Sequence, residues 1–359
     1  MSDQHWISKS DIRETKWVSR EQKTGPGEVR LTLDAFALTA NNVTYATFGG
    51  PPMHYWDFFP ADDPAWGRVP VWGFATVAES SVDGVAPGQR VYGYFPISSD
   101  LIVQPVRVSK TGFSDGAAHR QGLAPIYNAY SFTHADPVYV ADREAEQMLF
   151  RPLYMTGWMI VDSLMSAKAP PKTVVISSAS SKTALATAHG LHRQGVTTIG
   201  LTSAGNVDFV KGSGLYSKVL TYDEAGSLSP EAPAAYVDFV GRPALTTAVH
   251  TACGDALTRS LIIGMTDWEA DRTPPADLKG PQPEFFFVPT YAAERAKALG
   301  PEKLNEMTRE AMVSFYPVSR KFVTPEIVSG KDAIDTAWKA SVDGAVSPDR
   351  GLICKLQVA

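Results

Sequence analysis

The segment 173–187 reads TVVISSASSKTALAT and has the pattern of a strand, a turn of small residues and a helix. Residues 174–176 form a short apolar run typical of a buried parallel strand, and residues 184–192 have helix-forming composition. A small-residue turn at a helix N-terminus suits a pyrophosphate, because backbone N–H groups and the positive end of the helix dipole face the anion. We therefore interpret this segment as a candidate dinucleotide-binding turn, formed by Ser178, Ala179, Ser180, Ser181, Lys182 and Thr183.

The glycines of the dinucleotide fingerprint G-x-G-x-x-G are absent from this turn. Their places fall on Ala179, Ser181 and Ala184, so an ordinary strand-to-helix turn of an α/β domain is the alternative interpretation. The tripeptide 181–183, Ser-Lys-Thr, matches the end of a P-loop. The glycines of that motif are missing too, so we do not expect a phosphohydrolase.

The sequence that follows favours the dinucleotide interpretation. Further apolar strand patterns at 196–203, 235–240 and 261–266 continue a βαβ rhythm for about a hundred residues, which predicts a doubly wound sheet. No acidic residue follows the second strand, where Ser203 and Asn206 stand, with Lys211 nearby. An acid there would bind the ribose of NAD(H), whereas small donors and a cation favour the 2′-phosphate of NADP(H). A solvated helix lysine is the alternative role for Lys211.

Composition limits the possible classes of protein. The chain of 359 residues is long enough for two domains, and its 44% hydrophobic and 20% charged residues are typical of a soluble globular protein. A net charge of −5 argues against general nucleic-acid binding. The first residues lack the pattern of a signal peptide, the longest apolar run is too short to span a bilayer, and two cysteines cannot form a disulfide framework. We therefore expect a cytoplasmic protein with neither membrane nor nucleic-acid partners.

Three zones follow one another along the chain. Residues 1–150 are predicted to form a β-rich domain, 151–290 a nucleotide-binding domain, and 291–359 a segment that completes the nucleotide domain and returns to the first. The expected strands of the first zone lie at 29–37, 70–80, 89–95 and 100–108. The last zone contains a charged helical stretch at 292–313 and ends in a strand at 351–356.

Several motifs occur in an order that matches one known group of enzymes. They are the strand 29–40 followed by Asn41-Asn42, the segment VPVWGFATVAE at 69–79, the segment VDGVAPGQRVYG at 82–93, and the two strands ending at 241 and 266. Together they resemble the medium-chain dehydrogenase/reductase superfamily, in particular its zinc-free quinone oxidoreductase-like branch, over nearly the whole chain. Gln89 departs from the aspartate usual in that pattern, and Asn41-Asn42-x-Thr44-Tyr45 marks an uncharacterised subfamily.

The resemblance implies an α/β fold in which a GroES-like β-rich domain accompanies a Rossmann domain with a doubly wound parallel sheet. It also implies a homodimer, NADP(H) as cofactor, and further cofactor contacts at Tyr222, Gly241 and Thr266. The zinc-dependent branch needs cysteines and a Gly-His-Glu motif, but this chain has no cysteine before Cys253 and has Gly73-Phe74-Ala75 at that place. We therefore expect no metal, and a carbonyl polarised by hydrogen-bond donors instead.

Candidate donors come from the first zone. Asn41 stands where the resemblance places a substrate-facing asparagine, although it could also cap a turn, and Tyr45 offers a phenol that could orient a carbonyl or simply pack. The loop MHYWDFF at 53–59 is a candidate pocket wall or subunit contact. The predicted substrate pocket is formed by His54, Tyr55, Trp56, Phe58, Phe59 and Tyr127. Arg120 and Arg151 could bind a carboxylate or the cofactor phosphates, or pair with local acids.

These features predict an NADP(H)-dependent oxidoreductase that transfers hydride to or from a small or medium apolar carbonyl, enone or quinone. The lost glycine fingerprint leaves an alternative of a different class, because fold alone does not determine chemistry. That alternative is a non-redox enzyme, a C–C lyase or hydrolase-like protein acting on a β-dicarbonyl, or a binding protein without catalysis.

Overall fold

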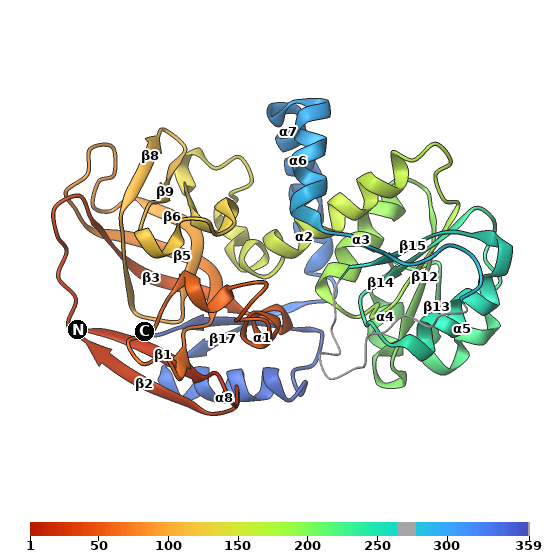
Figure 1. The fold of residues 1–359 in the computed structure, drawn as a ribbon, viewed down its shortest axis with the longest axis horizontal. Helices are drawn as coiled ribbons and strands as arrows, with labels where there is room; N and C mark the ends of the chain where they lie inside the picture. Colours follow the sequence, from red (N-terminus) through yellow and green to blue (C-terminus); the bar gives the residue numbers. More distant parts are fainter. Residues whose placement is uncertain (264–277, 358–359) are drawn as a thin grey trace. The chain divides into compact units, whose positions relative to one another are not determined.

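A computed structural model describes residues 1–263 and 278–357, and the chain divides into two units (Figure 1). The first unit consists of Met1–Leu149 and Thr324–Ala359, and the second of Phe150–Val323. The long helix α2 (Glu144–Met165) begins in the first unit and continues into the second.

The first unit is built on a nine-stranded sheet with the path β17-β18-β3-β5-β6-β10-β9-β8, to which β7 adds by pairing with β3. Its strands are β3 (Val29–Leu38), β5 (Pro70–Ser80), β6 (Arg90–Pro96), β7 (Asp100–Val103), β8 (Pro105–Ser109), β9 (Gly112–Asp115), β10 (Ala129–Phe132), β17 (Thr324–Ser329) and β18 (Arg350–Lys355). A second, three-stranded sheet has the order β2-β1-β4, formed by β1 (Ser2–Ser8), β2 (Thr15–Arg20) and β4 (Trp66–Gly67). The helices of this unit are α1 (Ala40–Thr47) and α8 (Lys331–Val342).

The side chains of β3 alternate between the core of the first unit and a less buried face. Val29, Leu31 and Leu33 are buried, and the residues between them are only partly buried, as the two-residue period of a strand requires. At its end β3 pairs antiparallel with β18, where Leu352 lies opposite Leu38. The last strand of the chain is thereby held in the sheet formed by the first hundred residues.

The second unit is a Rossmann sheet. Its six strands are all parallel and have the order β13-β12-β11-β14-β15-β16, which is the 3-2-1-4-5-6 order of a doubly wound fold. The strands are β11 (Thr173–Ile176), β12 (Thr197–Thr202), β13 (Lys218–Thr221), β14 (Ala234–Asp238), β15 (Leu257–Ile262) and β16 (Glu284–Phe285). The helices are α3 (Lys182–Arg193), α4 (Val207–Gly212), α5 (Pro243–Cys253), α6 (Val288–Leu299) and α7 (Pro301–Ser319). The predicted α/β class, with a β-rich part and a doubly wound parallel sheet, is confirmed.

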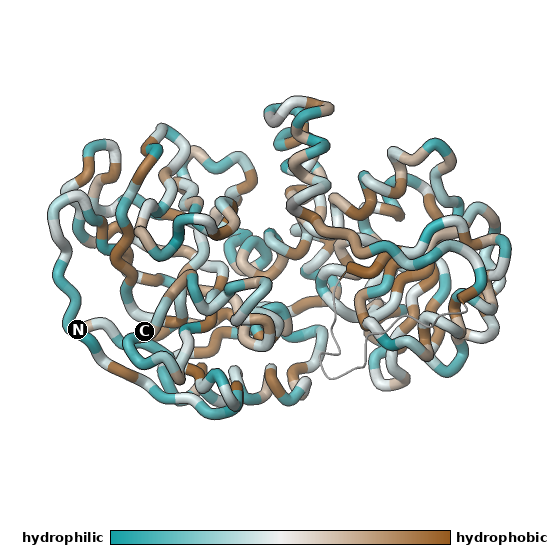
Figure 2. Tube along the Cα trace, in the orientation of Figure 1, coloured by the Kyte–Doolittle hydropathy of each residue, from teal (hydrophilic) through white to brown (hydrophobic). Residues whose placement is uncertain are grey.

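The hydrophobic colouring of Figure 2 concentrates on the central strands of each unit. In the second unit, Val174, Val175 and Ile176 of β11 are completely buried, which explains why this strand is a continuous apolar run rather than an alternating one. Among the described residues, no helix is long and apolar enough to cross a membrane.

Four local predictions need correction. The turn expected at Asn41 and Asn42 is the first turn of α1, which the side chain of Asn42 closes by accepting from the Thr39 backbone N–H at 2.7 Å. The strand expected at 100–108 is two strands, because the chain changes partner at Gln104: β7 pairs with β3 and β8 with β9. The helix expected at 292–313 is two helices separated by Gly300, whose φ of 85° ends α6. The strand expected at 261–266 begins earlier, at Leu257, and ends at Ile262, while residues 264–266 lie outside the described residues.

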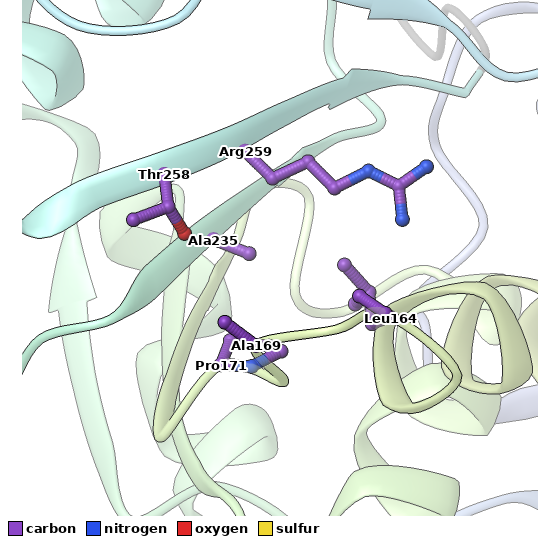
Figure 3. A pocket seen from close by; sticks show the side chains of 7 residues that line it. Leu164, Ala169, Pro171, Ala235, Thr258 and Arg259 are labelled. Atoms are coloured by element: carbon purple, nitrogen blue, oxygen red, sulfur yellow. The ribbon is translucent and has the colours of Figure 1, made fainter.

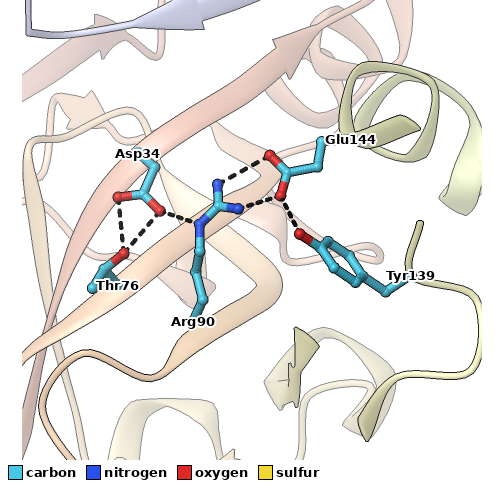
Figure 4. A network of polar contacts seen from close by, with 5 residues as sticks. All are labelled: Asp34, Thr76, Arg90, Tyr139 and Glu144. Atoms are coloured by element: carbon cyan, nitrogen blue, oxygen red, sulfur yellow. Dashed lines mark hydrogen bonds and ion pairs between the residues drawn. The ribbon is translucent and has the colours of Figure 1, made fainter. Parts of the chain in front are cut away.

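A polar network ties α2 to the β-rich sheet within the first unit (Figure 4). Arg90 of β6 pairs with Asp34 at 2.8 Å and with Glu144 at the start of α2. Tyr139 donates to the same glutamate at 2.8 Å, and Thr76 donates to Asp34 at 3.0 Å. One arginine therefore neutralises two carboxylates from different elements.

Candidate functional site

The turn after β11 is fixed by a buried network at its first residue. The Ser177 hydroxyl donates to Asp238 at 2.7 Å and accepts from the backbone N–H groups of Phe239 and Val240. Asp238 also accepts from the backbone of Gly241 at 3.1 Å. These bonds join the ends of β11 and β14, the two strands between which the order of a doubly wound sheet reverses and ligands are usually held.

The next two residues, Ser178 and Ala179, adopt a backbone angle or a packing position that limits the size of their side chains. Ser178 adopts the left-handed region with φ of 49°, which favours glycine. Ala179 is completely buried, and its backbone N–H donates to Leu201 of β12 at 3.0 Å. A Cβ added to Gly200 on that strand would lie 2.9 Å from the Cβ of Ala179. The glycine that makes room for this turn therefore stands on the neighbouring strand.

The rest of the turn leads directly into a helix. Ser181 is the N-cap of α3, and its hydroxyl accepts from the Ala184 backbone N–H at 3.3 Å. Ser180 accepts from the side-chain amide of Asn206 at 3.1 Å. Lys182 and Thr183 form the first turn of α3 and are partly exposed. The structure thus brings together the predicted turn residues and Asn206 at the carboxyl end of the parallel sheet.

Tyr222 lies beside Ser178, and Arg242 lies beside Tyr222. Tyr222 follows β13, and burial raises the pKa of its phenol, while the charge of Arg242 and hydrogen bonds with Ser178 act in the opposite direction. The Arg242 guanidinium lies 5.6 Å from the centre of the Tyr222 ring. Gly241, with φ of 72°, precedes that arginine. Arg242 was not among the predicted site residues, because nothing in its sequence neighbourhood distinguishes it from a solvated arginine.

Ser203 and Lys211, predicted to accept a 2′-phosphate, lie after β12 and are exposed. Ser203 begins a short 3-10 turn at residues 204–206, and Lys211 lies in the last turn of α4. No acidic residue occupies the stretch 202–207 that follows the strand, and Asp208 is the first acid after it. Thr266, predicted to line the cofactor, lies outside the described residues.

A small hollow of about 210 Å³ occurs in the same unit at the other edge of the sheet (Figure 3). Leu164 comes from the end of α2, and Pro171, Ala235 and Arg259 lie before or at the beginning of their strands. The amino ends of the strands form this edge, whereas nucleotides in doubly wound sheets bind at the carboxyl ends. Arg259 is also engaged, because it pairs with Glu284 at 2.8 Å and donates to Ser163. This hollow is separate from the candidate site.

The first unit contains a cluster of aromatic rings around Tyr45. The ring of Tyr45 lies 4.5 Å from that of Tyr55 and 5.6 Å from that of Tyr94, and the ring of Tyr127 lies 4.7 Å from Tyr94. Trp72 donates to the Tyr45 hydroxyl at 3.3 Å. We call Tyr45, Tyr55, Trp72, Tyr94 and Tyr127, with Phe58, the tyrosine cluster. Tyr94 and Trp72 were not predicted, because they are strand residues that look like ordinary core in the sequence.

The two candidate donors, Asn41 and Tyr45, lie one turn apart on α1, so their side chains share one face of the helix. Burial raises the pKa of Tyr45 well above its usual value, and hydrogen bonds from Trp72 and Asn41 oppose that shift only in part. Tyr45 is 4% exposed, so the phenol keeps its proton at any ordinary pH.

The other predicted pocket residues lie in different surroundings. Tyr55, Phe58 and Tyr127 belong to the tyrosine cluster. His54 does not: it has φ of 58° and pairs with Asp57 at 2.8 Å on the exposed side of the loop. Trp56 fills the space beside two glycines, since a Cβ at Gly49 or Gly67 would lie within 2.2 Å of its ring.

Phe59 and the buried Arg120 lie beside the cluster. The Arg120 guanidinium lies 4.5 Å from the centre of the Phe59 ring and pairs with Asp115 at 3.1 Å. The sequence left open whether Arg120 binds a ligand or pairs with a local acid. In the structure it pairs with Asp115. Arg68, which the sequence did not single out, is also buried. Among the described residues, no group of three or more His, Cys, Asp and Glu side chains is arranged to hold a metal ion.

A family profile described as "Protein of unknown function (DUF2855)" matches residues 36–347, which is most of the chain. The chain belongs to the DUF2855 family. That match includes both units, the small-residue turn and the tyrosine cluster. No curated protein matches the sequence.

Solved structures share the fold of this DUF2855 protein at low identity. CurA from Vibrio vulnificus in complex with NADPH has a TM-score of 0.61 at 12% identity, covering 96% of this chain and 95% of that one. A mutant enoyl thioester reductase from Candida tropicalis has a TM-score of 0.61 at 12% identity and covers 99% of each chain. The yhdH oxidoreductase from Salmonella enterica in complex with NADP has a TM-score of 0.59 at 15% identity, covering 99% of this chain and 100% of that one. These likenesses confirm the fold of this DUF2855 protein, in which a β-rich unit accompanies a doubly wound parallel sheet.

Proposed function

We propose that this DUF2855 protein is an NADP(H)-dependent oxidoreductase that transfers hydride to or from a small or medium apolar carbonyl, enone or quinone without zinc. The observation that carries the proposal is the turn 178–181. It stands at the carboxyl end of β11 and the N-terminus of α3, and its bulk is accommodated by Gly200. Two of the structural neighbours were solved with NADPH or NADP.

The residues of this turn suit a pyrophosphate. The side chains of Ser178, Ser180 and Ser181 are small enough for close approach, and the N-terminus of α3 directs backbone N–H groups and the positive end of its dipole to the turn. Lys182 adds a positive charge in the first helical turn. Serine has less backbone freedom than the glycine of the usual fingerprint. Its hydroxyl group, however, is a hydrogen-bond donor that glycine lacks and that a phosphate oxygen could accept from.

The choice of NADP(H) over NAD(H) follows from the residues after β12. Ser203 and Lys211 would bind the 2′-phosphate, and an acid that would repel it is absent from 202–207. Asn206, Tyr222, Gly241 and Thr266 complete the proposed set of cofactor contacts. When bound, the nicotinamide supplies or accepts the hydride.

The substrate is assigned to the first unit. Asn41 and Tyr45 would donate hydrogen bonds to the carbonyl oxygen, which stabilises the negative charge that develops there as the hydride is transferred. The tyrosine cluster would exclude water and bind the apolar part of the substrate. A homodimer and a cytoplasmic location belong to the same proposal.

The first experiment is a calorimetric titration of the purified protein with NADPH and with NADH at fixed salt. We expect micromolar binding of NADPH and at least about tenfold weaker binding of NADH, because one charge-assisted phosphate contact contributes roughly that factor. Lys211→Ala should weaken NADPH binding and leave NADH binding unchanged. Lys168→Ala, an exposed lysine after α2, is the matched control. Failure of both nucleotides to bind would refute the proposed function.

A further inference from the structure

Arg68 is a buried arginine with two side-chain nitrogens that have no hydrogen-bond partner among the described residues. It follows β4 and is only 7% exposed, and its Nε and Nη2 atoms are buried without a partner in the described structure. Buried polar groups are nearly always hydrogen-bonded, and a buried guanidinium without a partner is strongly destabilising. Such a residue indicates a ligand that the folded chain alone does not supply.

The charges around Arg68 do not compensate it. Arg120, the other buried arginine nearby, repels it and is already paired with Asp115 at 3.1 Å. The attracting acid is Asp62, which is exposed and pairs with Arg20 at 3.1 Å. Burial lowers the pKa of Arg68 to about 10, so it stays charged at neutral pH. One positive charge therefore has no buried counter-charge among the described residues.

The unpaired atoms define the geometry of the missing partner. Nε and Nη2 lie on one edge of the planar guanidinium, and their two N–H groups point the same way, which matches the two oxygens of a carboxylate. Arg120, whose charge acts on Arg68, connects it to the aromatic rings of this unit. Arg120 lies over Phe59, and the Phe59 ring is 6.0 Å from that of Tyr94 in the tyrosine cluster. The chain just before Arg68 is mostly exposed at residues 62–65.

We propose that Arg68 binds the carboxylate of a small aromatic or apolar acid, with its apolar part directed to the tyrosine cluster. The assignment of such acids as the substrate class rests on the proposed function. The binding of a carboxylate by Arg68 does not depend on it. An acid with a carbonyl or enone group would then be held by Arg68 at one end and by Asn41 and Tyr45 at the other.

The test is a thermal-shift titration without nucleotide, with benzoate, its neutral counterpart benzamide, and inorganic phosphate at constant ionic strength. We expect benzoate to raise the Tm of the wild-type protein and benzamide to leave it unchanged. Arg68→Met should abolish the benzoate effect and, because a buried uncompensated charge is removed, should itself raise the Tm by about 4 °C. Arg107→Met, at an exposed arginine of the same unit, should keep the full benzoate response.

Arg68→Lys is the second variant, and it keeps the assay informative if Arg68→Met does not fold. Lysine keeps the charge but loses the two-donor edge, so benzoate should bind about tenfold more weakly. Equal benzoate responses in the wild type and in either folded Arg68 variant would overturn the proposal, as would no response in the wild type. A response to phosphate instead of benzoate would overturn the assignment to a carboxylate. Since nucleotide is absent, each result is independent of the NADPH titration that tests the reductase proposal.

Discussion

Ala179, in the turn after β11, and Gly200, on the neighbouring strand β12, form a complementary pair. The Cβ of Ala179 uses the space that Gly200 leaves open, since a Cβ on Gly200 would approach it to 2.9 Å. Real Cβ atoms do not come so close, so one member of the pair must lack a Cβ unless the turn moves. In this protein the turn residue, Ala179, has the Cβ and the strand residue, Gly200, lacks one.

Substitution of Gly200 should therefore disturb the turn. We expect Gly200→Ala to destabilise the protein by about 1–3 kcal/mol through overpacking and to weaken NADPH binding. Because Tyr216 also lies 2.9 Å from the added Cβ, the double variant Gly200→Ala/Ala179→Gly should recover only part of the loss. Urea denaturation and calorimetry measure the two effects. Full additivity of the two substitutions would show that the pair is not coupled.

Tyr45 should affect the chemical step without affecting cofactor binding. We expect Tyr45→Phe to lower kcat about 100-fold with a carbonyl or quinone acceptor, because the hydrogen bond to the developing negative charge is lost. The dissociation constant of NADPH should not change. Burial raises the pKa of Tyr45, so ionisation of this phenol should not shape the pH profile of kcat in the wild-type protein.

Tyr139→Phe is the matched control for that experiment. It removes a phenol of the same unit that donates to Glu144 at 2.8 Å and is not part of the tyrosine cluster. A normal kcat in Tyr45→Phe, or an equal loss in both variants, would contradict a donor role for Tyr45.

His189 should make the protein less stable in mild acid. Burial, together with the positive charge of Arg193, lowers the pKa of His189 to about 4. Its Nδ1 is hydrogen-bonded to the Tyr154 hydroxyl at 3.0 Å. Above its ordinary value near 6.5 the imidazole is neutral in both the folded and unfolded states. As pH falls from 6.5 to 4, only the unfolded state takes up the proton, so stability should decrease by about 3 kcal/mol.

Tm measured from pH 7 to pH 4.5 checks this, and a titration of the imidazole signals by NMR gives the pKa directly. His189→Gln should flatten the acid-side decrease, whereas His134→Gln, at an exposed histidine of the other unit, should not. An NMR pKa near 6.5 for His189 would show the explanation to be wrong.

Arg90 should stabilise the start of α2 against the β-rich sheet. Without it, Asp34 and Glu144 lose their shared counter-charge (Figure 4), so we expect Arg90→Met to cost about 1–2 kcal/mol. Adding Glu144→Gln should recover part of that loss. Arg30→Met, which breaks a more exposed pair with Glu79, should cost less than about 1 kcal/mol. Urea denaturation in low and high salt distinguishes these outcomes, and equal costs for Arg90 and Arg30 would count against the network.

The predicted fold class could be obtained from the sequence because local patterns determine it. The apolar run of β11, the serine that caps α3 and the following strands are all readable within short windows of the chain. The order of motifs then indicated the superfamily fold. Predictions were less accurate where a strand changes partner at Gln104 or where Gly300 divides a helical stretch, because both depend on distant contacts or on one backbone angle.

The same difference between local patterns and distant contacts applies to the candidate sites. The sequence alone determined the small-residue turn and the aromatic loop, whose members are close in the chain. Only the tertiary structure placed Tyr94 and Trp72 around Tyr45 and placed Gly200 next to Ala179. It also buried Nε and Nη2 of Arg68 with no hydrogen-bond partner among the described residues. The physical reason is that burial, ring packing and the loss of a counter-charge are properties of residues distant in sequence, and these become neighbours only when the chain folds.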